Sequence, residues 1–310
     1  MNLQNIFSEI ENVDPEVYER FDTRRSAMKQ FVNVSGKIAL AAMPLALGSM
    51  FKKAYGQAPS DVLDVLRFGF LLEQLEARFY IVGLNSPAIT SAAGAVNTFA
   101  LTKIRDHEIL HREYLRGVLT AVGATPSTIE PTFDFTGGAT TVSPNIGNGP
   151  FKGFDTQYDI FLAVAQTLED TGVRAYKGQA GRLINNKPIL TAALNIHSVE
   201  ARHAARIRRM RRLRSTASGA GTFPAAYTGD IKPWIEGNQS NISGTNPTIG
   251  ATNPNFAAAV QPNYNGEDLA IQLGVNIAAV GGVSSSAATA SFDEPLTKAV
   301  VEGLVDGFIV

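Results

Sequence analysis

The sequence predicts an all-α protein built around a four-helix bundle, and three observations support this prediction. Between residues 60 and 214 the apolar residues recur at spacings of three and four, the period of a helix buried on one face. Turn-rich stretches divide this region into four segments. The motifs of the first two segments recur in the last two, which indicates a repeated pair of helices.

Each element follows from local signals. The helices are expected at residues 61–84, 96–122, 154–180 and 188–214, with Ser60 as the N-cap of the first. The Pro- and Gly-bearing connection between helices 2 and 3, residues 123–153, is long enough to cross from one end of a bundle to the other. The expected organisation is a signal-like N-terminal arm (1–57), the bundle (58–214) and an irregular Gly/Asn/Ser-rich extension (215–310). Apolar residues return at helical spacing from Leu296 to Val305, so the extension is expected to end in a short docking helix.

Composition excludes several classes of function. A net charge of -1 with 18% charged residues argues against a generally basic nucleic-acid binder and against an acidic disordered chain. The absence of cysteine excludes disulfide scaffolds, iron–sulfur clusters, thiolate zinc sites and cysteine nucleophiles. A metal ion would therefore be held by oxygen and imidazole, and the chain has only 4 histidines.

The repeated pair of helices carries a repeated set of polar residues. The first and third helices share a Glu that is followed seven residues later by a Tyr, and the second and fourth share the motif Glu-x-x-His. The residues are Glu73 with Tyr80, Glu169 with Tyr176, Glu108 with His111, and Glu200 with His203.

This pattern predicts a dimetal site. Residues three apart share a helix face, and here that face is also the apolar one, so the polar groups point inward. Without a cation nearby, each buried carboxylate would cost several kcal/mol in lost solvation. Two divalent cations would remove that cost. The predicted ligands match the set described for dimetal carboxylate bundles: Glu73, Glu108, His111, Glu169, Glu200 and His203. Oxygen and imidazole ligands favour two iron or manganese ions and also suit zinc. The alternative is a bundle that keeps these residues but binds no metal.

Three further residues are expected beside the ligands. Glu76 competes with Glu73, but its counterpart in the third helix is Gly172, so the repeat selects Glu73 and leaves Glu76 as a reserve or bridging ligand. Tyr80 and Tyr176 are expected to be buried core residues whose hydroxyls orient a carboxylate or histidine.

Other polar residues are expected outside the ligand set. His107 and His197 do not overlay on each other in the repeat. Seven arginines lie between Arg202 and Arg214, which raises the possibility of a nucleic-acid surface. Cations at a helix C-terminus and acidic residues in the C-terminal segment explain the run better, so nucleic acid is not an expected partner.

The first 57 residues resemble a twin-arginine export signal. Arg24 and Arg25 precede Phe31, and the uncharged stretch Ile38–Phe51 is shorter than the roughly 20 residues that span a bilayer. In Ala54-Tyr55-Gly56, the alanine and the glycine place small residues at the positions that a signal peptidase reads. This predicts an exported protein, periplasmic or at the cell surface, without a transmembrane helix. The alternative is an ordered N-terminal arm that the mature chain retains.

Four segments together resemble the ferritin-like domain proteins related to the plant desiccation-associated protein. They are LEQLEARFYIVG (72–83), LEDTGVRAYKGQ (168–179), IHSVEARHAARIR (196–208) and FDEPLTKAVVEGLVDGFI (292–309). The resemblance runs from about residue 60 to the C-terminus. It implies a ferritin-like four-helix bundle with an extended C-terminal region, and it implies metal ligands at the same six positions. It implies the fold and the site more strongly than any one reaction.

The leading functional hypothesis is an exported dimetal carboxylate protein in stress protection. Its chemistry would be a catalase- or ferroxidase-like oxidation and reduction of peroxide or dioxygen, and the chain is expected to form a homo-oligomer. The rival is a structural or surface-assembly protein that uses the bundle as a scaffold, favoured by the low charge and the long polar C-terminal region. A stress-protective metal store is a third option.

Overall fold

The computed structural model describes residues 60–127, 130–139, 145–216, 231–242, 256–272 and 274–310. The signal-like segment 1–57 expected from the sequence lies outside these residues. The chain forms two compact units. The described residues of the first unit are 117–124, where a helix ends and Gly123 adopts a φ of +82° while the Ala124 amide donates to the Leu119 carbonyl. Apart from residues 117–121, which end one of the helices, everything described below belongs to the second unit, residues 58–116 and 125–310.

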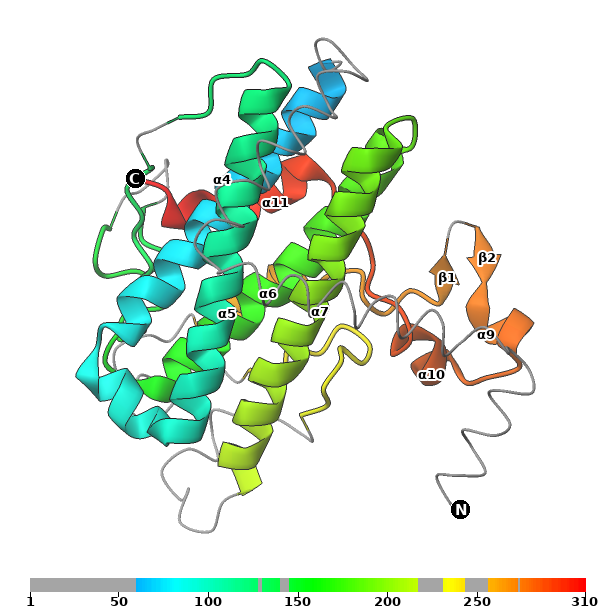
Figure 1. Cartoon of the computed structure of the whole chain (residues 1–310). Helices are drawn as coiled ribbons and strands as arrows, with labels where there is room; N and C mark the ends of the chain where they lie inside the picture. The colour runs from blue at the N-terminus through cyan, green and yellow to red at the C-terminus, as the bar shows by residue number, and fades with distance from the viewer. Residues whose placement is uncertain (1–59, 128–129, 140–144, 217–230, 243–255, 273) are drawn as a thin grey trace, which may run out of the picture. The chain divides into compact units, whose positions relative to one another are not determined.

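Four long helices make up the bundle, which confirms the predicted all-α class (Figure 1). Within the described residues the only strands are two short ones that pair antiparallel, β1 (Ile271–Gln272) and β2 (Val275–Asn276). No single described helix is long and apolar enough to cross a membrane; α4 and α5, which meet at a bend of 95°, satisfy that criterion only as a pair. The four helices are α4 (Ser60–Leu84), α5 (Pro87–Ala121), α6 (Tyr158–Ala180) and α7 (Lys187–Thr216).

Two helix starts differ most from prediction. Helix α5 begins at Pro87, and Gly94 inside it has a φ of +70°, so two helical segments meet there in a kink. The predicted start at residue 96 corresponds to the second segment. Helix α6 begins at Tyr158, four residues later than predicted, because residues 151–156 form turns and Gln157 is extended, with a φ of -125° and a ψ of 110°.

Helix α6 is the centre of the core. Every residue from Tyr158 to Tyr176 is buried, so this helix is covered on all sides rather than on one stripe. On one side the Phe79 ring of α4 stacks on the Phe161 ring of α6 at 4.9 Å between centroids. Gly83 makes room for this contact, since a Cβ there would lie 2.1 Å from the Phe161 ring. Helix α7 covers a second side of α6.

The C-terminal extension covers the rest of α6. Helix α11 packs against α6, and the Leu296 amide donates to the Arg174 carbonyl at 3.1 Å. Gly178 lies against the Leu296 backbone, where a Cβ would come within 1.8 Å of the carbonyl oxygen. Phe308 stacks on Phe151 at 5.4 Å. The helical elements of the extension are α8 (Phe256–Val260), η3 (Gln261–Tyr264), α9 (Ile277–Gly281), α10 (Ser285–Thr289), α11 (Lys298–Val305) and η4 (Asp306–Phe308).

Buried arginines join the bundle to the extension. The Arg174 guanidinium lies 2.5 Å from the Glu267 carboxylate and donates to the carbonyls of Asn265 and Glu294, each at 2.8 Å. Arg211 of α7 donates to the Asn241 carbonyl at 2.6 Å.

Within the arginine run of α7, the carboxylate partners differ from those expected. Arg208 pairs with Asp170 at 2.5 Å, and Arg214 pairs with Asp159. Both carboxylates belong to α6 rather than to the acidic C-terminal segment. Tyr264 of the extension then donates to Asp170 at 2.7 Å, so the ion pair between two bundle helices also holds the extension.

Candidate metal centre

The structure brings all six sequence-predicted ligand residues together inside the bundle. Each of the four long helices contributes, and the Glu-x-x-His spacing places both groups of a motif on the inward face of α5 or α7. All four glutamates have an exposed fraction of 0%, and the His203 residue is 4% exposed. Their donor atoms form two overlapping sets, with all atoms of a set within 4.8 Å of one another. The sets are Glu73, Glu108, His111 and Glu200, and Glu108, Glu169, Glu200 and His203.

His111 faces three carboxylates through a single nitrogen. Its Nδ1 lies 3.2 Å from an oxygen of each of Glu73, Glu108 and Glu200. A protonated Nδ1 has one hydrogen to donate, and the well-directed bond goes to Glu108 Oε2. The facing oxygens of Glu73 and Glu200 are therefore buried without a hydrogen bond.

His203 repeats this arrangement on the other side. Its Nδ1 bonds Glu169 Oε2 at 3.2 Å and lies 2.7 Å from Glu108 Oε1, which has no hydrogen bond of its own. The Nε2 atom points away from the carboxylates and lies 2.9 Å from Nδ1 of the exposed His107, with the two rings stacked at 5.2 Å.

The residues present fit a pair of cations. Buried carboxylate oxygens normally have hydrogen-bond partners, but here Glu73 Oε2, Glu108 Oε1 and both oxygens of Glu200 have none. Carboxylate oxygens and imidazole nitrogens are the donors that iron, manganese and zinc accept. Glu108 and Glu200 occur in both donor sets, so the sets share two members. The cluster is thus compatible with a dimetal site.

The shifted pKa values of the glutamates show that burying their charges together is unfavourable without cations. Burial, partly offset by the charge on His111, raises the pKa of Glu73 to about 7, and burial with the charge on Glu108 raises that of Glu200 well above its usual range. Burial would raise the pKa of Glu108 as well, but the hydrogen bond from His111 and the charges on His203 and His111 outweigh it and lower the value to about 2.

The same carboxylates act on the histidines. Burial would lower the pKa of His203, but the charge on Glu169, the hydrogen bond to Glu169 and the charge on Glu108 raise it to about 11. The pKa of His111 is raised likewise, mainly by the charge on Glu73 acting against burial. Without metal the cluster therefore holds protons, and a metal ion that takes these ligands must displace them.

Two tyrosines orient the outer carboxylates, in the arrangement that the repeat suggested. The Tyr80 hydroxyl of α4 donates to Glu169 Oε1 at 2.5 Å, and the Tyr176 hydroxyl of α6 donates to Glu73 Oε1. Burial raises the pKa of both tyrosines well above 10.0, so both hydroxyls stay protonated as donors. Each tyrosine thus holds one oxygen of the partner helix's Glu and leaves the other oxygen facing a histidine.

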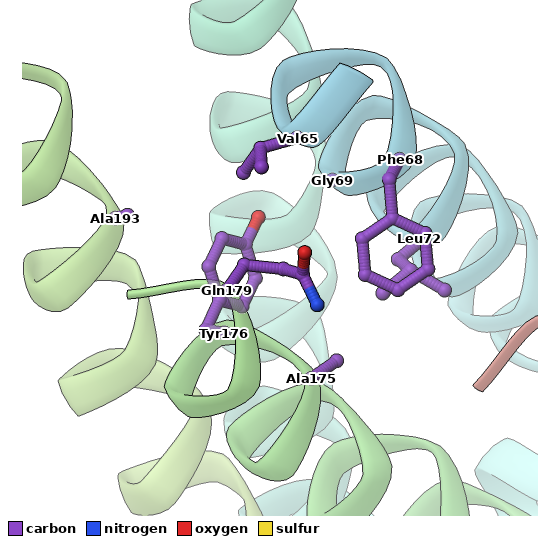
Figure 2. Close-up of a pocket in the computed structure, with 8 residues that line it drawn as sticks. All are labelled: Val65, Phe68, Gly69, Leu72, Ala175, Tyr176, Gln179 and Ala193. Atoms are coloured by element: carbon purple, nitrogen blue, oxygen red, sulfur yellow. The ribbon is translucent and has the colours of Figure 1, made fainter. Parts of the chain in front are cut away.

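A pocket reaches Tyr176 from outside the cluster. Figure 2 shows Val65 and Leu72 of α4 on one side, Tyr176 of α6 beside them and Ala193 of α7 opposite. The lining is mainly apolar, and Tyr176, one of the lining residues, is also the donor to Glu73.

Two residues lie next to the cluster without belonging to either donor set. Glu76, expected as a reserve or bridging ligand, is only 3% exposed and, like Glu200, comes within 3.2 Å of the point where Gly172 would carry a Cβ. His107, expected outside the ligand set, contacts the ring of His203. Its position four residues before His111, on the same helix face, is the signal that could have found it. His197 does lie apart, with its Nδ1 3.0 Å from the Val173 carbonyl.

Comparison with known proteins supports the same domain. No curated protein and no solved structure gave a significant match to the chain. A family model described as a ferritin-like domain matches residues 61–212, a span that contains all six predicted ligand residues. Residues 61–212, with their four-helix core and buried Glu/His cluster, are a ferritin-like domain.

Proposed function

We propose that this protein holds two iron or manganese ions in the bundle and uses them in redox chemistry with dioxygen or peroxide. The observation that carries the proposal is the pair of overlapping donor sets, with four buried carboxylate oxygens that lack hydrogen bonds. When bound, such ions supply electron transfer to a small oxygen-containing substrate, which zinc does not.

The residues of the cluster would have different roles in holding the two ions. Glu108 and Glu200, the shared members of the two sets, would bridge the ions; Glu73 with His111, and Glu169 with His203, would each bind one ion. Tyr80 and Tyr176 hold the outer carboxylates in place through the hydrogen bonds described above. The four glutamates are fully buried, which keeps bulk water away from the site.

Metal analysis tests the first half of this proposal. Purified protein, loaded anaerobically with ferrous or manganous ions and freed of excess, is expected to retain two ions per chain. The Glu108→Gln/Glu200→Gln double variant should lose them, and Glu113→Gln, which alters an exposed carboxylate on α5, should keep them. Fewer than one ion per wild-type chain would contradict the proposal.

Activity assays test the second half. Peroxide disproportionation by the manganese form and oxygen consumption by the ferrous form are both to be measured against the same double variant. Activity that survives the loss of Glu108 and Glu200 would contradict a dimetal mechanism. Unchanged assembly with no activity lost would instead favour the structural, surface-assembly role.

Export and a role in stress or desiccation protection form part of the proposal. They are supported by Arg24 and Arg25 ahead of an uncharged apolar stretch and by the resemblance of four segments to desiccation-associated proteins. Fractionation of cells that express the chain, compared with an Arg24→Lys/Arg25→Lys variant, is expected to show export only of the wild type. A homo-oligomer is expected from the resemblance, and the mass in solution tests it.

A further inference from the structure

The repeat of the helix pairs is broken at one place inside the cluster. Where α4 carries Glu76, one helical turn after Glu73, α6 carries Gly172. The two positions also meet in space: a Cβ on Gly172 would lie 3.2 Å from Glu76 Oε1 and 3.2 Å from Glu200 Oε2. The missing side chain on α6 is therefore the space into which two carboxylates reach.

Among the residues that the structure describes, none forms a hydrogen bond or ion pair with Glu76 that would explain its burial. Its exposed fraction is 3%, and its Oε2 atom has no hydrogen bond. A buried carboxylate without a cation is costly, and replacing it with an apolar residue would normally stabilise a core. The charges that act on it are those of Glu200, Glu108, Glu169 and Glu73, all members of the two donor sets.

We propose that Glu76 is a seventh protein ligand of the metal pair, placed beside Glu200, and that glycine at position 172 is what admits it. This inference rests on the proposed function, because it concerns the same metal centre. A ligand at Glu76 makes the two donor sets unequal. The six ligands of the repeat alone would give both sets the same kinds of residue.

The fifth carboxylate has a consequence for the oxidation state. Four carboxylates with neutral histidines carry four negative charges, which balance two divalent ions. With Glu76 ionised the count is five, so it exceeds the charge of two divalent ions and falls below that of two trivalent ions. Glu76 should therefore favour the more highly charged, oxidised pair and lower its reduction potential.

The test compares Glu76→Gln with wild type and with the exposed control Glu113→Gln. Glutamine keeps the shape and removes the buried charge, so the metal-free variant is expected to unfold at the same temperature as wild type or higher. Competition with a chelator should show cobalt(II) affinity at least about tenfold weaker in Glu76→Gln. Its visible absorption should intensify, since cobalt(II) with fewer ligands absorbs more strongly. The iron-loaded variant should have a higher midpoint potential.

A second variant tests the role of the glycine. In Gly172→Ala the new Cβ would crowd Glu76 Oε1 and Glu200 Oε2, so the cobalt(II) spectrum should change. When Gly172→Ala is added to Glu76→Gln, the cobalt(II) spectrum should change less, because the side chain at position 76 no longer binds metal and only Glu200 is affected.

The outcomes separate this inference from the proposed function. If wild type binds two cobalt ions and Glu76→Gln matches it in affinity and spectrum, Glu76 is no ligand and the inference fails while the dimetal proposal stands. If wild type binds no cobalt, iron or manganese, the dimetal proposal fails and the inference fails with it.

Discussion

At the scale of single residues, the hydrogen bonds from the tyrosines are the most direct link between the fold and the cluster. Tyr176 reaches from α6 to Glu73 of α4, and Tyr80 reaches from α4 to Glu169 of α6. Each bond fixes which oxygen of the glutamate faces the histidines. The tyrosine rings fill the core, while their hydroxyls set the geometry of the carboxylates.

Removing one of these hydroxyls should weaken metal binding without unfolding the chain. In Tyr176→Phe the ring remains and Glu73 loses its donor, so manganese affinity is expected to fall by about 10–100-fold, the range for groups that orient ligands. Tyr80→Phe should behave similarly, because its contact with Glu169 is the repeat of the first. Chelator competition measures both, and Tyr114→Phe serves as the control. Equal affinities in all three variants would show that the bonds do not position the ligands.

The protonation of the cluster predicts how the metal-free protein responds to pH. The folded-state pKa of Glu73 is about 7 against 4.5 for a free side chain, and that of His203 is about 11 against 6.5. Both groups bind protons more tightly in the folded state than in the unfolded state. Their contribution to the free energy of unfolding is therefore present at low pH and is lost as pH rises. The lowered pKa of Glu108, about 2, acts in the opposite direction but only below 4.5.

Metal-free protein should therefore become less stable between about pH 5 and pH 8. Urea unfolding with a chelator present measures this decline. Loading with manganese should reduce or reverse it, because metal ions replace the protons and bind more tightly as pH rises. A metal-free protein whose stability increases over that interval would contradict the assignment of raised pKa values to the cluster.

The repeat explains which site residues could be predicted from sequence. Glu73, Glu108, His111, Glu169, Glu200 and His203 occur in both halves, so aligning the helices finds them. Glu76 and His107 each occur in only one of the two helix pairs, so the alignment gives neither residue an equivalent in the other pair. Their positions depend on how α4 packs on α6 and how α5 packs on α7, which the period of one helix does not specify.

At the scale of elements, glycines decide how closely the helices pack. The sequence predicted four helices correctly because their apolar period is long, but it could not predict the kink at Gly94 or the turns and extended Gln157 that precede α6. Likewise, counting charges could not show that Arg208 pairs with Asp170 of α6, since the pairing depends on the register of α7 against α6.

Gly178 should prove essential for seating the C-terminal segment on α6. In Gly178→Ala the Cβ would lie 1.8 Å from the Leu296 carbonyl oxygen, and backbone cannot move aside as a flexible side chain would. The expected cost is about 1–3 kcal/mol of unfolding free energy, measured by urea denaturation. Gly181→Ala is the matched control, because its Cβ would meet nothing within 4 Å and its φ of -60° suits alanine. Equal stability of the two variants would mean that the segment is not seated there.

At the scale of the whole molecule, the extension completes the core of the bundle. Helix α6 is buried on all sides, and the bundle helices alone do not cover it; α11 and η3 contact it as well. Sequence composition suggested an irregular appendage, because residues 215–310 are rich in Gly, Ser and Asn and show no sustained helical period. Composition could not show that the polar backbone of this segment would supply carbonyl acceptors for the buried arginines of α6 and α7.

The contacts of Arg174 should contribute strongly to the attachment of the extension to the bundle. Its guanidinium and the Glu267 carboxylate are both buried and lie 2.5 Å apart, so Arg174→Met would leave a buried carboxylate without its cation. The expected loss is about 3–5 kcal/mol of unfolding free energy, with faster proteolysis of the extension. Adding Glu267→Leu should recover part of the loss, because the unpaired charge is then removed as well. Arg209→Met, an exposed change on α7, should stay within about 0.5 kcal/mol of wild type. If Arg174→Met unfolds at the same urea concentration as Arg209→Met, the Arg174–Glu267 pair does not stabilise the attachment of the extension.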